Sequence, residues 1–340
     1  MSVFKVAILR LRECSITTPV PLAEIINMSS EKSLTADEIL PTDRYNWVVQ
    51  DCPVCEKPPT KLIGKRGGAA HRSGAGVTSS IWLCKDCGMV FPNPMPVPID
   101  GLGQHYDIDA DDYFQHHDQG AKFSNVQVLL DQAGDLVGAK GRLLDIGAGR
   151  GELLKSARDS GWECVGIEPS STFAEYATRI SGATIYREPV ESCNFPESSF
   201  DVVILAAVLE HLYDPNGTIK AISRILRKGG ALFIDVPNEQ GLYFRVGNLY
   251  QKFNGRDWVV NLAPTFPPFH LFGFGKKSLC RLLKKHGLEP TKLRFYGGQS
   301  NLQSGASARG SIEVLASRLV SAVSNMGSLG TYIETWAIKQ

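Results

Sequence analysis

Three glycines, followed about twenty positions later by an acidic residue, form the most chemically informative pattern in the chain. Gly147, Gly149 and Gly151 come after a short apolar run, and Glu168 ends the next apolar run. Glycines allow a tight turn in which the backbone approaches a ligand closely. A helix that starts directly after the turn offers free N–H groups, and a carboxylate at Glu168 can accept bonds from both ribose hydroxyls. The pattern therefore predicts a nucleotide-type cofactor site.

The spacing of the glycines narrows the cofactor. They form GxGxG, whereas the dinucleotide fingerprint is GxGxxG, and Asp145 lies just before the turn. Asp145 and the three glycines together resemble motif I of the class I S-adenosylmethionine (SAM)-dependent methyltransferases. The resemblance implies that SAM is bound by a set of residues on one edge of a sheet: Asp145, Gly147, Ala148, Gly149, Gly151, Glu168, Pro169, Val190, Glu191 and Ala206.

The adenine end of this site departs from the family pattern. Such enzymes usually carry an acidic residue between the third and fourth strands, and this chain has Glu188 and Glu191 in that region. The resemblance leaves open whether one of these side chains, or a backbone group of Val190 or Glu191, lies near the adenine.

Later segments extend the resemblance to roughly Asp51–Glu289. They are similar to successive motifs of small-molecule methyltransferases, above all the ubiquinone-biosynthesis O-methyltransferase branch and its relatives that begin with a zinc ribbon. The segments are Phe200-Asp201-Val202-Val203, Val208-Leu209-Glu210-His211-Leu212-Tyr213-Asp214-Pro215, Leu226-Arg227-Lys228-Gly229-Gly230 and Val236-Pro237-Asn238. The resemblance implies a SAM-dependent methyltransferase (EC 2.1.1.-).

Two histidines and a glutamate are the candidate catalytic residues. Methyl transfer to a hydroxyl requires that the acceptor be positioned and that its proton be removed, and a neutral imidazole suits the second task. His211 follows the fourth predicted strand, beside the expected methyl group, and His270 lies in a later loop. Glu210 can orient either histidine or contact the substrate. A structural role for His211, as a hydrogen-bonded residue at a helix start, is an equal alternative.

Four of the eight cysteines form two CxxC pairs, Cys52/Cys55 and Cys84/Cys87. Two such knuckles can deliver four thiolates tetrahedrally to one Zn²⁺ ion. The alternatives are two disulfides or a redox-active CxxC pair. Disulfides suit a secreted chain, and a redox-active site would have one CxxC pair rather than two. With four sulfur ligands no coordination position is left for substrate, so the predicted zinc is structural.

The elements that must position these residues alternate between strand and helix after residue 140, which predicts parallel βαβ units. We expect an α/β fold with a Rossmann-like, seven-stranded, mostly parallel sheet whose last strand is antiparallel, preceded by a small zinc ribbon. The expected organisation is a weakly ordered tail over residues 1–44, the zinc ribbon over 45–98 and the methyltransferase domain over 99–340. Two insertions, over about 239–275 and 297–330, are predicted to act as lids.

Two further segments have weaker predicted roles. The aromatic and acidic residues 101–119 suit a docking helix or a cap on the cofactor pocket. An amphipathic helix carrying Ile312, Leu315 and Leu319 suits a homodimer face or an additional lid.

Composition restricts the partners. Thirty-six basic against 35 acidic residues give a net charge of +1, which disfavours a dedicated nucleic-acid binder. No apolar run is long enough to span a membrane, and no secretory signal is evident, so we expect a cytoplasmic protein.

The leading expectation is O-methylation of a hydroxylated small molecule, such as a sugar or a polysaccharide precursor. The alternatives are a sugar C-methyltransferase, an RNA methyltransferase and a non-catalytic SAM-binding zinc-ribbon adaptor.

Overall fold

The structure is a computed structural model, and it describes residues 44–99, 126–297 and 327–340. Three of the predicted segments therefore lie outside the described residues, wholly or almost so. They are the tail before residue 44, the aromatic segment 101–119 and the amphipathic helix that carries Ile312.

The centre of the fold is a seven-stranded sheet in the order β11-β12-β10-β9-β6-β7-β8. Its strands are β6 (Arg142–Ile146), β7 (Glu163–Ile167), β8 (Thr184–Tyr186), β9 (Phe200–Ala206), β10 (Leu226–Pro237), β11 (Leu288–Tyr296) and β12 (Tyr332–Lys339). The neighbours from β10 to β8 pair in parallel, whereas β12 runs antiparallel to both β10 and β11. The predicted fold class is confirmed, including the antiparallel last strand.

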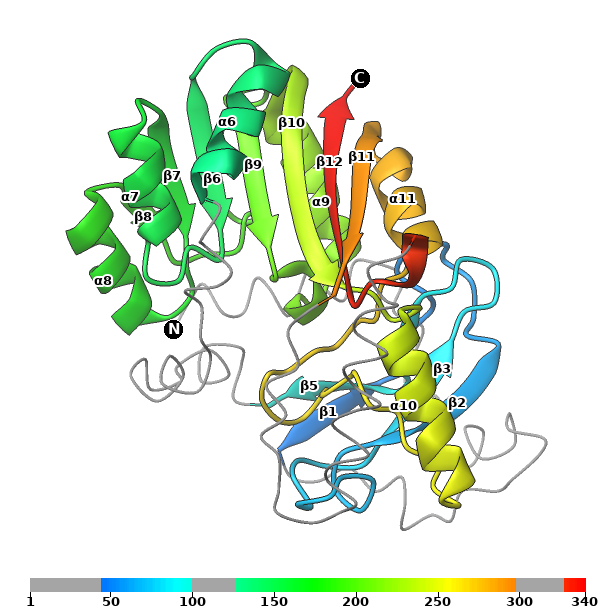
Figure 1. The fold of residues 1–340 in the computed structure, drawn as a ribbon. Helices are drawn as coiled ribbons and strands as arrows, with labels where there is room; N and C mark the ends of the chain where they lie inside the picture. Colours follow the sequence, from blue (N-terminus) through cyan, green and yellow to red (C-terminus); the bar gives the residue numbers. More distant parts are fainter. Residues whose placement is uncertain (1–43, 100–125, 298–326) are drawn as a thin grey trace, which may run out of the picture.

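Helices cover both faces of this sheet (Figure 1). They are α6 (Val126–Val137), α7 (Glu152–Asp159), α8 (Ser171–Ser181), α9 (Pro215–Ile225) and α11 (Lys276–Lys285). Helix α10 (Leu242–Phe253) lies away from the sheet, beside the N-terminal strands (Figure 1), and η2 (Leu209–His211) and η3 (Gly327–Leu329) are one-turn helices. Because side chains alternate along a strand, Val202 and Ile204 of β9 pack with α6 and α7, whereas Val203 and Leu205 pack with α9 and α11. Two apolar cores result, one on each face.

The N-terminal module consists of two small antiparallel sheets. One pairs β1 (Tyr45–Val48) with β5 (Met95–Pro98), and the other joins β2 (Lys61–Arg66), β3 (Ser79–Leu83) and β4 (Val90–Pro92). The carboxyl ends of the parallel strands point toward this module and toward α10 (Figure 1). Several of its buried residues, among them Cys84, Met89 and Phe91, belong to the same apolar core as Phe272 and the α9 side of the sheet. The module therefore packs continuously with the seven-stranded sheet and its helices.

The segment Lys228-Gly229-Gly230, quoted above for the resemblance, lies inside β10 and not in a loop before it. Helix α9 ends at Ile225, directly before this strand. The pairing register with β9 shifts between Leu226 and Ala231, and Gly229 has a φ of 74°. The register shift marks a bulge or irregularity within the strand. A glycine in the left-handed conformation is compatible with such a bulge, as it is with a turn.

None of the helices in the described ranges is long and apolar enough to cross a membrane.

Candidate functional site

The glycine turn lies between β6 and α7, at the carboxyl edge of the sheet. Gly147 has a φ of 77°, and a Cβ there would collide with the side chain of Val208, which follows β9. Gly151, with a φ of 78°, is the N-cap of α7 and lies against Ala177 of α8. Both positions therefore require glycine for conformation and for space. Gly147 and Ala148 donate their N–H groups to the carbonyl of Ile167, which ties the turn to β7.

Glu168 closes this turn from the end of β7. Its buried carboxylate accepts the N–H of Gly149 at 2.9 Å and the N–H of Ser170 at 3.0 Å. Burial raises the pKa of Glu168, while the two N–H donors act in the opposite direction. Ser170 was not predicted as a partner of this carboxylate. Its hydroxyl also caps α8 by accepting the N–H of Phe173.

Asp145 lies beneath the turn and is almost completely buried. Burial, and to a smaller extent the charge of Glu168, raises the pKa of Asp145 to about 7. Two buried carboxyl groups at one ligand-binding turn favour a cationic ligand, because a positive charge would stabilise both in their ionised forms.

The remaining predicted cofactor residues lie around the same edge. Pro169 follows Glu168, and Ala206 is the last residue of β9. Val190 is buried in the apolar core, and the carboxylate of Glu191 accepts a hydrogen bond from the hydroxyl of Thr218 in α9. The Glu191 side chain is therefore bonded to a helix of the fold.

A second cluster, Glu210, His211 and His270, lies just beyond the end of β9. Ala207 turns the chain there with a φ of 55°, which is unusual for a residue other than glycine. The Nε2 atoms of His211 and His270 lie 3.8 and 4.0 Å from the same carboxylate oxygen of Glu210. The two rings make an edge contact with centroids 4.8 Å apart. The structure thus brings together all three predicted catalytic residues, which are far apart in the sequence.

Within this cluster the glutamate is buried, whereas the two histidines are partly exposed. The Glu210 side chain is 1% exposed, against 21% for His211 and 18% for His270. One candidate ligand atom from each residue lies within 4.8 Å of the others, an arrangement that can also hold a divalent cation. The cluster can therefore act as a proton-accepting group or as a metal ligand set.

Backbone hydrogen bonds position His270. The carbonyl of Glu210 accepts the N–H groups of Leu271 at 2.8 Å and Phe272 at 3.1 Å, and Ala263 donates its N–H to the carbonyl of His270 at 3.0 Å. The insertion over residues 239–275 is thus bonded directly to the loop after β9.

Several polar residues near the cluster were not predicted. Tyr296 donates its hydroxyl to Asp235 at 2.8 Å, and its ring stacks on that of Tyr332 with centroids 5.3 Å apart. Burial, followed by the negative charges of Asp235 and Glu210, raises the pKa of Tyr332. The phenol of Tyr332 is therefore close enough to Glu210 to interact with its charge. The sequence contained no local signal for this group, because its members occupy three strands joined only by sheet pairing.

Glu239, directly after β10, was also missed. It is buried, and burial raises the pKa of its carboxyl group to about 7, although Asn261 donates a hydrogen bond to it at 2.6 Å. Its backbone N–H donates to the carbonyl of Phe274, closing the base of the insertion.

The four predicted metal-ligating cysteines converge on one point. The sulfur atoms of Cys52 and Cys87 are 3.4 Å apart, and those of Cys55 and Cys84 are 3.3 Å apart. These separations exceed the bond of about 2.0 Å in a disulfide, and all four thiols are free. The carbonyls of Cys52 and Cys84 accept the N–H groups of Glu56 and Gly88, which folds each CxxC pair into a tight turn. Four convergent sulfurs on two such turns fit a tetrahedral metal ion.

The cysteine module and the insertion are joined by several hydrogen bonds. Val90 and Gly273 exchange backbone N–H···O bonds of 3.1 and 2.8 Å, and β2 pairs with residues 257–259 through Lys65. The Arg66 side chain donates to the carbonyl of Leu262 at 2.6 Å. A small apolar cluster of Ile81, Val90, Val259 and Leu262 fills the contact. The module therefore supports the segment that carries His270.

Comparison with known proteins identifies the family of the chain. Residues 114–293 match a family described as a methyltransferase domain. The ubiquinone biosynthesis O-methyltransferase of Bordetella avium is 29% identical over 172 residues, which cover 49% of this chain and 68% of that protein. The protein with the same description from Aeromonas salmonicida is 27% identical over 166 residues, covering 47% and 67%. A crystal structure of a SAM-dependent methyltransferase from Archaeoglobus fulgidus aligns at 17% identity and a TM-score of 0.45, over 63% of this chain and 93% of that one.

Proposed function

Since the chain belongs to the methyltransferase-domain family and is a SAM-dependent methyltransferase, we propose that it O-methylates a hydroxylated small molecule, such as a sugar or a polysaccharide precursor. The observation that carries this proposal is the convergence of Glu210, His211 and His270 beside the end of β9. A hydroxyl acceptor must lose a proton, and this cluster supplies imidazole bases within reach of a buried carboxylate.

The proposed cofactor site is the turn between β6 and α7. The carboxylate of Glu168 would accept the two ribose hydroxyls while keeping its bonds to Gly149 and Ser170, since each carboxylate oxygen has two lone pairs. Asp145, with its raised pKa, would be held ionised by the positive charge of the cofactor. For the adenine end, the buried position of Val190 and the bond from Thr218 to Glu191 favour a backbone contact rather than the Glu191 carboxylate.

SAM supplies an electrophilic methyl group on a sulfonium. The protein would hold the hydroxyl oxygen of the acceptor in line with the bond between the methyl carbon and the sulfur, and it would remove the proton of that hydroxyl. We assign proton removal to His211 or His270. The proton would pass to an imidazole nitrogen as the new C–O bond forms and the bond from the methyl group to the cofactor sulfur breaks, which leaves S-adenosylhomocysteine. The carboxylate of Glu210, placed beside both Nε2 atoms, would stabilise the resulting imidazolium.

We assign the four cysteines to a structural Zn²⁺ ion held by Cys52, Cys55, Cys84 and Cys87. Their convergence and their burial support this assignment. The ion would stabilise the turn before β4, and β4 is bonded to the insertion through Val90 and Gly273. In this way the zinc module would fix the position of His270 without contacting the substrate.

Two alanine variants test the proposal, using a purified acceptor found by screening hydroxylated metabolites with labelled SAM. Whichever of His211→Ala and His270→Ala removes the base should reduce kcat by a factor of roughly 10²–10⁴, the usual contribution of general base catalysis, while affinity for S-adenosylhomocysteine is unchanged. Near-normal turnover in both variants would rule out these residues as the base. Product analysis separates the alternatives, because a methyl group on carbon or on RNA would contradict the proposed reaction.

A further inference from the structure

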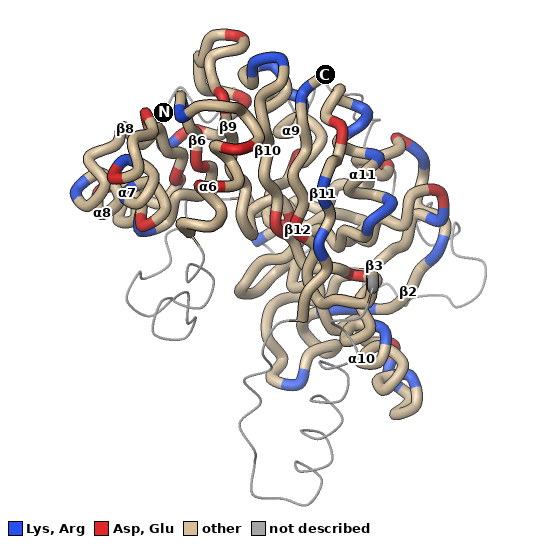
Figure 2. The backbone as a smooth tube through the Cα atoms, turned by 45° about the horizontal axis from the view of Figure 1, so that its top comes forward, with Lys and Arg blue, Asp and Glu red and all other residues tan. Residues whose placement is uncertain are grey.

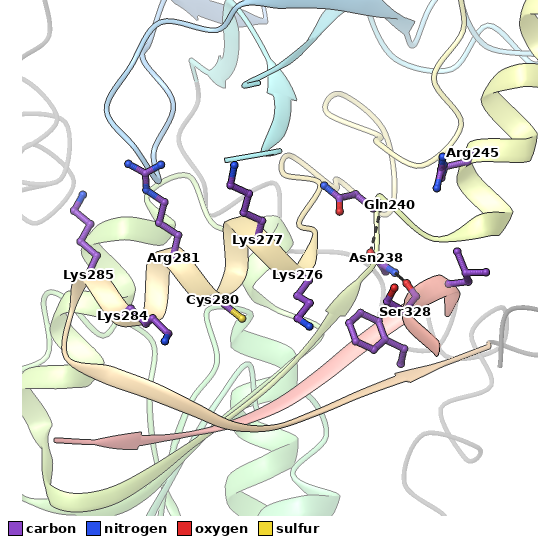
Figure 3. Close-up of a pocket in the computed structure, with 12 residues that line it drawn as sticks. Asn238, Gln240, Arg245, Lys276, Lys277, Cys280, Arg281, Lys284, Lys285 and Ser328 are labelled. Carbon is purple, nitrogen blue, oxygen red and sulfur yellow. Dashed lines mark hydrogen bonds between the residues drawn. The ribbon is translucent and has the colours of Figure 1, made fainter. Parts of the chain in front are cut away.

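A cavity of about 960 Å³ lies on the side of α11 that faces the insertion (Figure 3). Its walls come from α11, from Asn238 and Gln240 after β10, from Arg245 of α10, from Phe295 of β11 and from η3. It is large enough for a small organic molecule. None of the predicted cofactor residues or candidate bases lines it, so it is a separate site.

The cavity is strongly cationic. Six of the 12 residues that line it carry a positive charge, and none carries a negative one; the six are Arg245, Lys276, Lys277, Arg281, Lys284 and Lys285. This contrasts with the whole chain, in which 36 basic residues are balanced by 35 acidic ones. Figure 2 shows the same concentration of Lys and Arg along α11.

The charges are compensated at only one end. Lys284 pairs with Glu289 at 2.7 Å, and Lys285 pairs with Glu56 at 2.6 Å. Among the described residues, Arg245 and Lys276 form no ion pair. They lie toward the end of the cavity nearest the insertion, together with Asn238, Gln240 and Ser328 (Figure 3). That end therefore combines unpaired cations with neutral hydrogen-bonding groups.

The position of Lys276 is unfavourable for the helix itself. Lys276 and Lys277 are the first two residues of α11, and no acidic residue occupies its first turn. The N-terminus of a helix carries a partial positive charge, so the two lysine charges there interact unfavourably with the helix dipole. An anion bound at this end of the cavity would offset this repulsion, because it attracts both the lysines and the helix N-terminus.

We propose that this cavity binds a phosphoryl or pyrophosphoryl group carried by the methyl acceptor, which deepens the proposed function and rests on it. Lysine supplies point charges and arginine a planar fork, the two side chains with which proteins hold phosphate oxygens. The acceptor is then a phosphorylated hydroxyl compound, with its charged group in the cavity and its hydroxyl at Glu210, His211 and His270.

The chain connection between the two sites makes this geometry feasible. Lys276 follows His270 by six positions, so at about 3.3–3.6 Å per residue their Cα atoms are separated by no more than roughly 20 Å. Glu239, which lies between the cavity residues Asn238 and Gln240, is bonded through its N–H to Phe274 of the connecting segment. A phosphorylated sugar bearing a further group can span such a distance.

Calorimetric titration with inorganic pyrophosphate at low ionic strength tests the site directly. We expect binding by the full chain that weakens as salt rises, and at least tenfold weaker binding by a Lys276→Ala/Arg245→Ala variant. The matched control, Lys220→Ala/Lys228→Ala, removes two exposed charges that do not line the cavity and should bind as the unmodified protein does. Melting temperature verifies that each variant is folded.

Three outcomes would overturn the proposal: no pyrophosphate binding, equal binding by the cavity variant, or an equal loss in the control, which indicates general charge attraction. Binding of S-adenosylhomocysteine is measured in the same samples and should not change in any variant. A protein that O-methylates a neutral acceptor while failing to bind pyrophosphate refutes only the phosphoryl site. A protein that binds pyrophosphate but transfers no methyl group to any hydroxyl refutes the proposed reaction.

Discussion

Replacement of Glu168 by glutamine is the sharpest test of the cofactor site. The carboxylate accepts the N–H groups of Gly149 and Ser170 and, in our proposal, both ribose hydroxyls. Glutamine has the same shape, but its NH₂ group cannot accept a hydrogen bond and would face one of these N–H donors. A hydrogen bond to a charged group contributes about 1.5–3 kcal/mol. We therefore expect a loss of about 3 kcal/mol in cofactor binding, or roughly 150-fold in Kd.

Isothermal titration with S-adenosylhomocysteine measures this loss. Glu163→Gln is the matched control, because Glu163 begins the same strand, is exposed and forms its ion pair, among the residues that the structure describes, with Arg142 of the neighbouring strand β6. The control should bind S-adenosylhomocysteine normally. Since burial raises the pKa of Glu168, removing its charge should not unfold the protein. A folded Glu168→Gln protein whose affinity is within threefold of normal would refute the assignment of this carboxylate to the ribose.

Three further predictions concern other parts of the site. Because burial raises the pKa of Asp145 to about 7 and a cationic cofactor favours its ionised form, SAM affinity should fall as pH drops below about 7, and Asp145→Asn should remove this dependence in a pH series of titrations. The effect of pH on the stability of the cofactor-free protein has the opposite sign. Because the pKa of Asp145 is higher in the folded than in the unfolded chain, the contribution of this carboxyl group to the free energy of unfolding is lost as pH rises through about 7. Chemical denaturation at pH 8 should therefore show that the Asp145→Asn variant has gained stability relative to the unmodified protein. Removing the proposed zinc ion by chelation should increase proteolysis of residues 239–275 and abolish transfer, whereas S-adenosylhomocysteine affinity should change little. Unaltered proteolysis would contradict a role of the cysteine site in supporting the insertion. Tyr296→Phe leaves Asp235 without its 2.8 Å hydrogen bond and should raise the acceptor KM with little effect on cofactor Kd, and an unchanged KM would place this pair outside the acceptor site.

Local sequence patterns predicted the parts of the fold that depend on nearby residues. The glycine turn and the two CxxC knuckles are each formed within a few positions of the chain, so residue type and spacing are sufficient. The alternation of strands and helices likewise predicted the sheet, because parallel strands require crossover helices.

Contacts between distant segments could not be predicted in the same way. The sequence marked His211 and His270 as separate candidates, and the bonds from Leu271 and Phe272 to the carbonyl of Glu210 hold their two segments together in the structure. The sequence contained no sign of contact between the predicted zinc ribbon and the insertion, whereas β2 and β4 pair with residues 257–259 and 273. Asp235, Tyr296 and Tyr332 meet through strand order, and strand order has no signature in any short stretch of sequence.

The most direct measurement of the central claim is identification of the methylated product by NMR, after incubation of the protein with SAM whose methyl group is isotopically labelled and a pool of phosphorylated hydroxyl compounds. We predict a labelled ether methyl on a phosphorylated acceptor, formed by the unmodified protein and not by a folded variant in which His211 and His270 are both alanine. A labelled methyl on carbon or nitrogen, or an equal yield from that variant, would contradict the account.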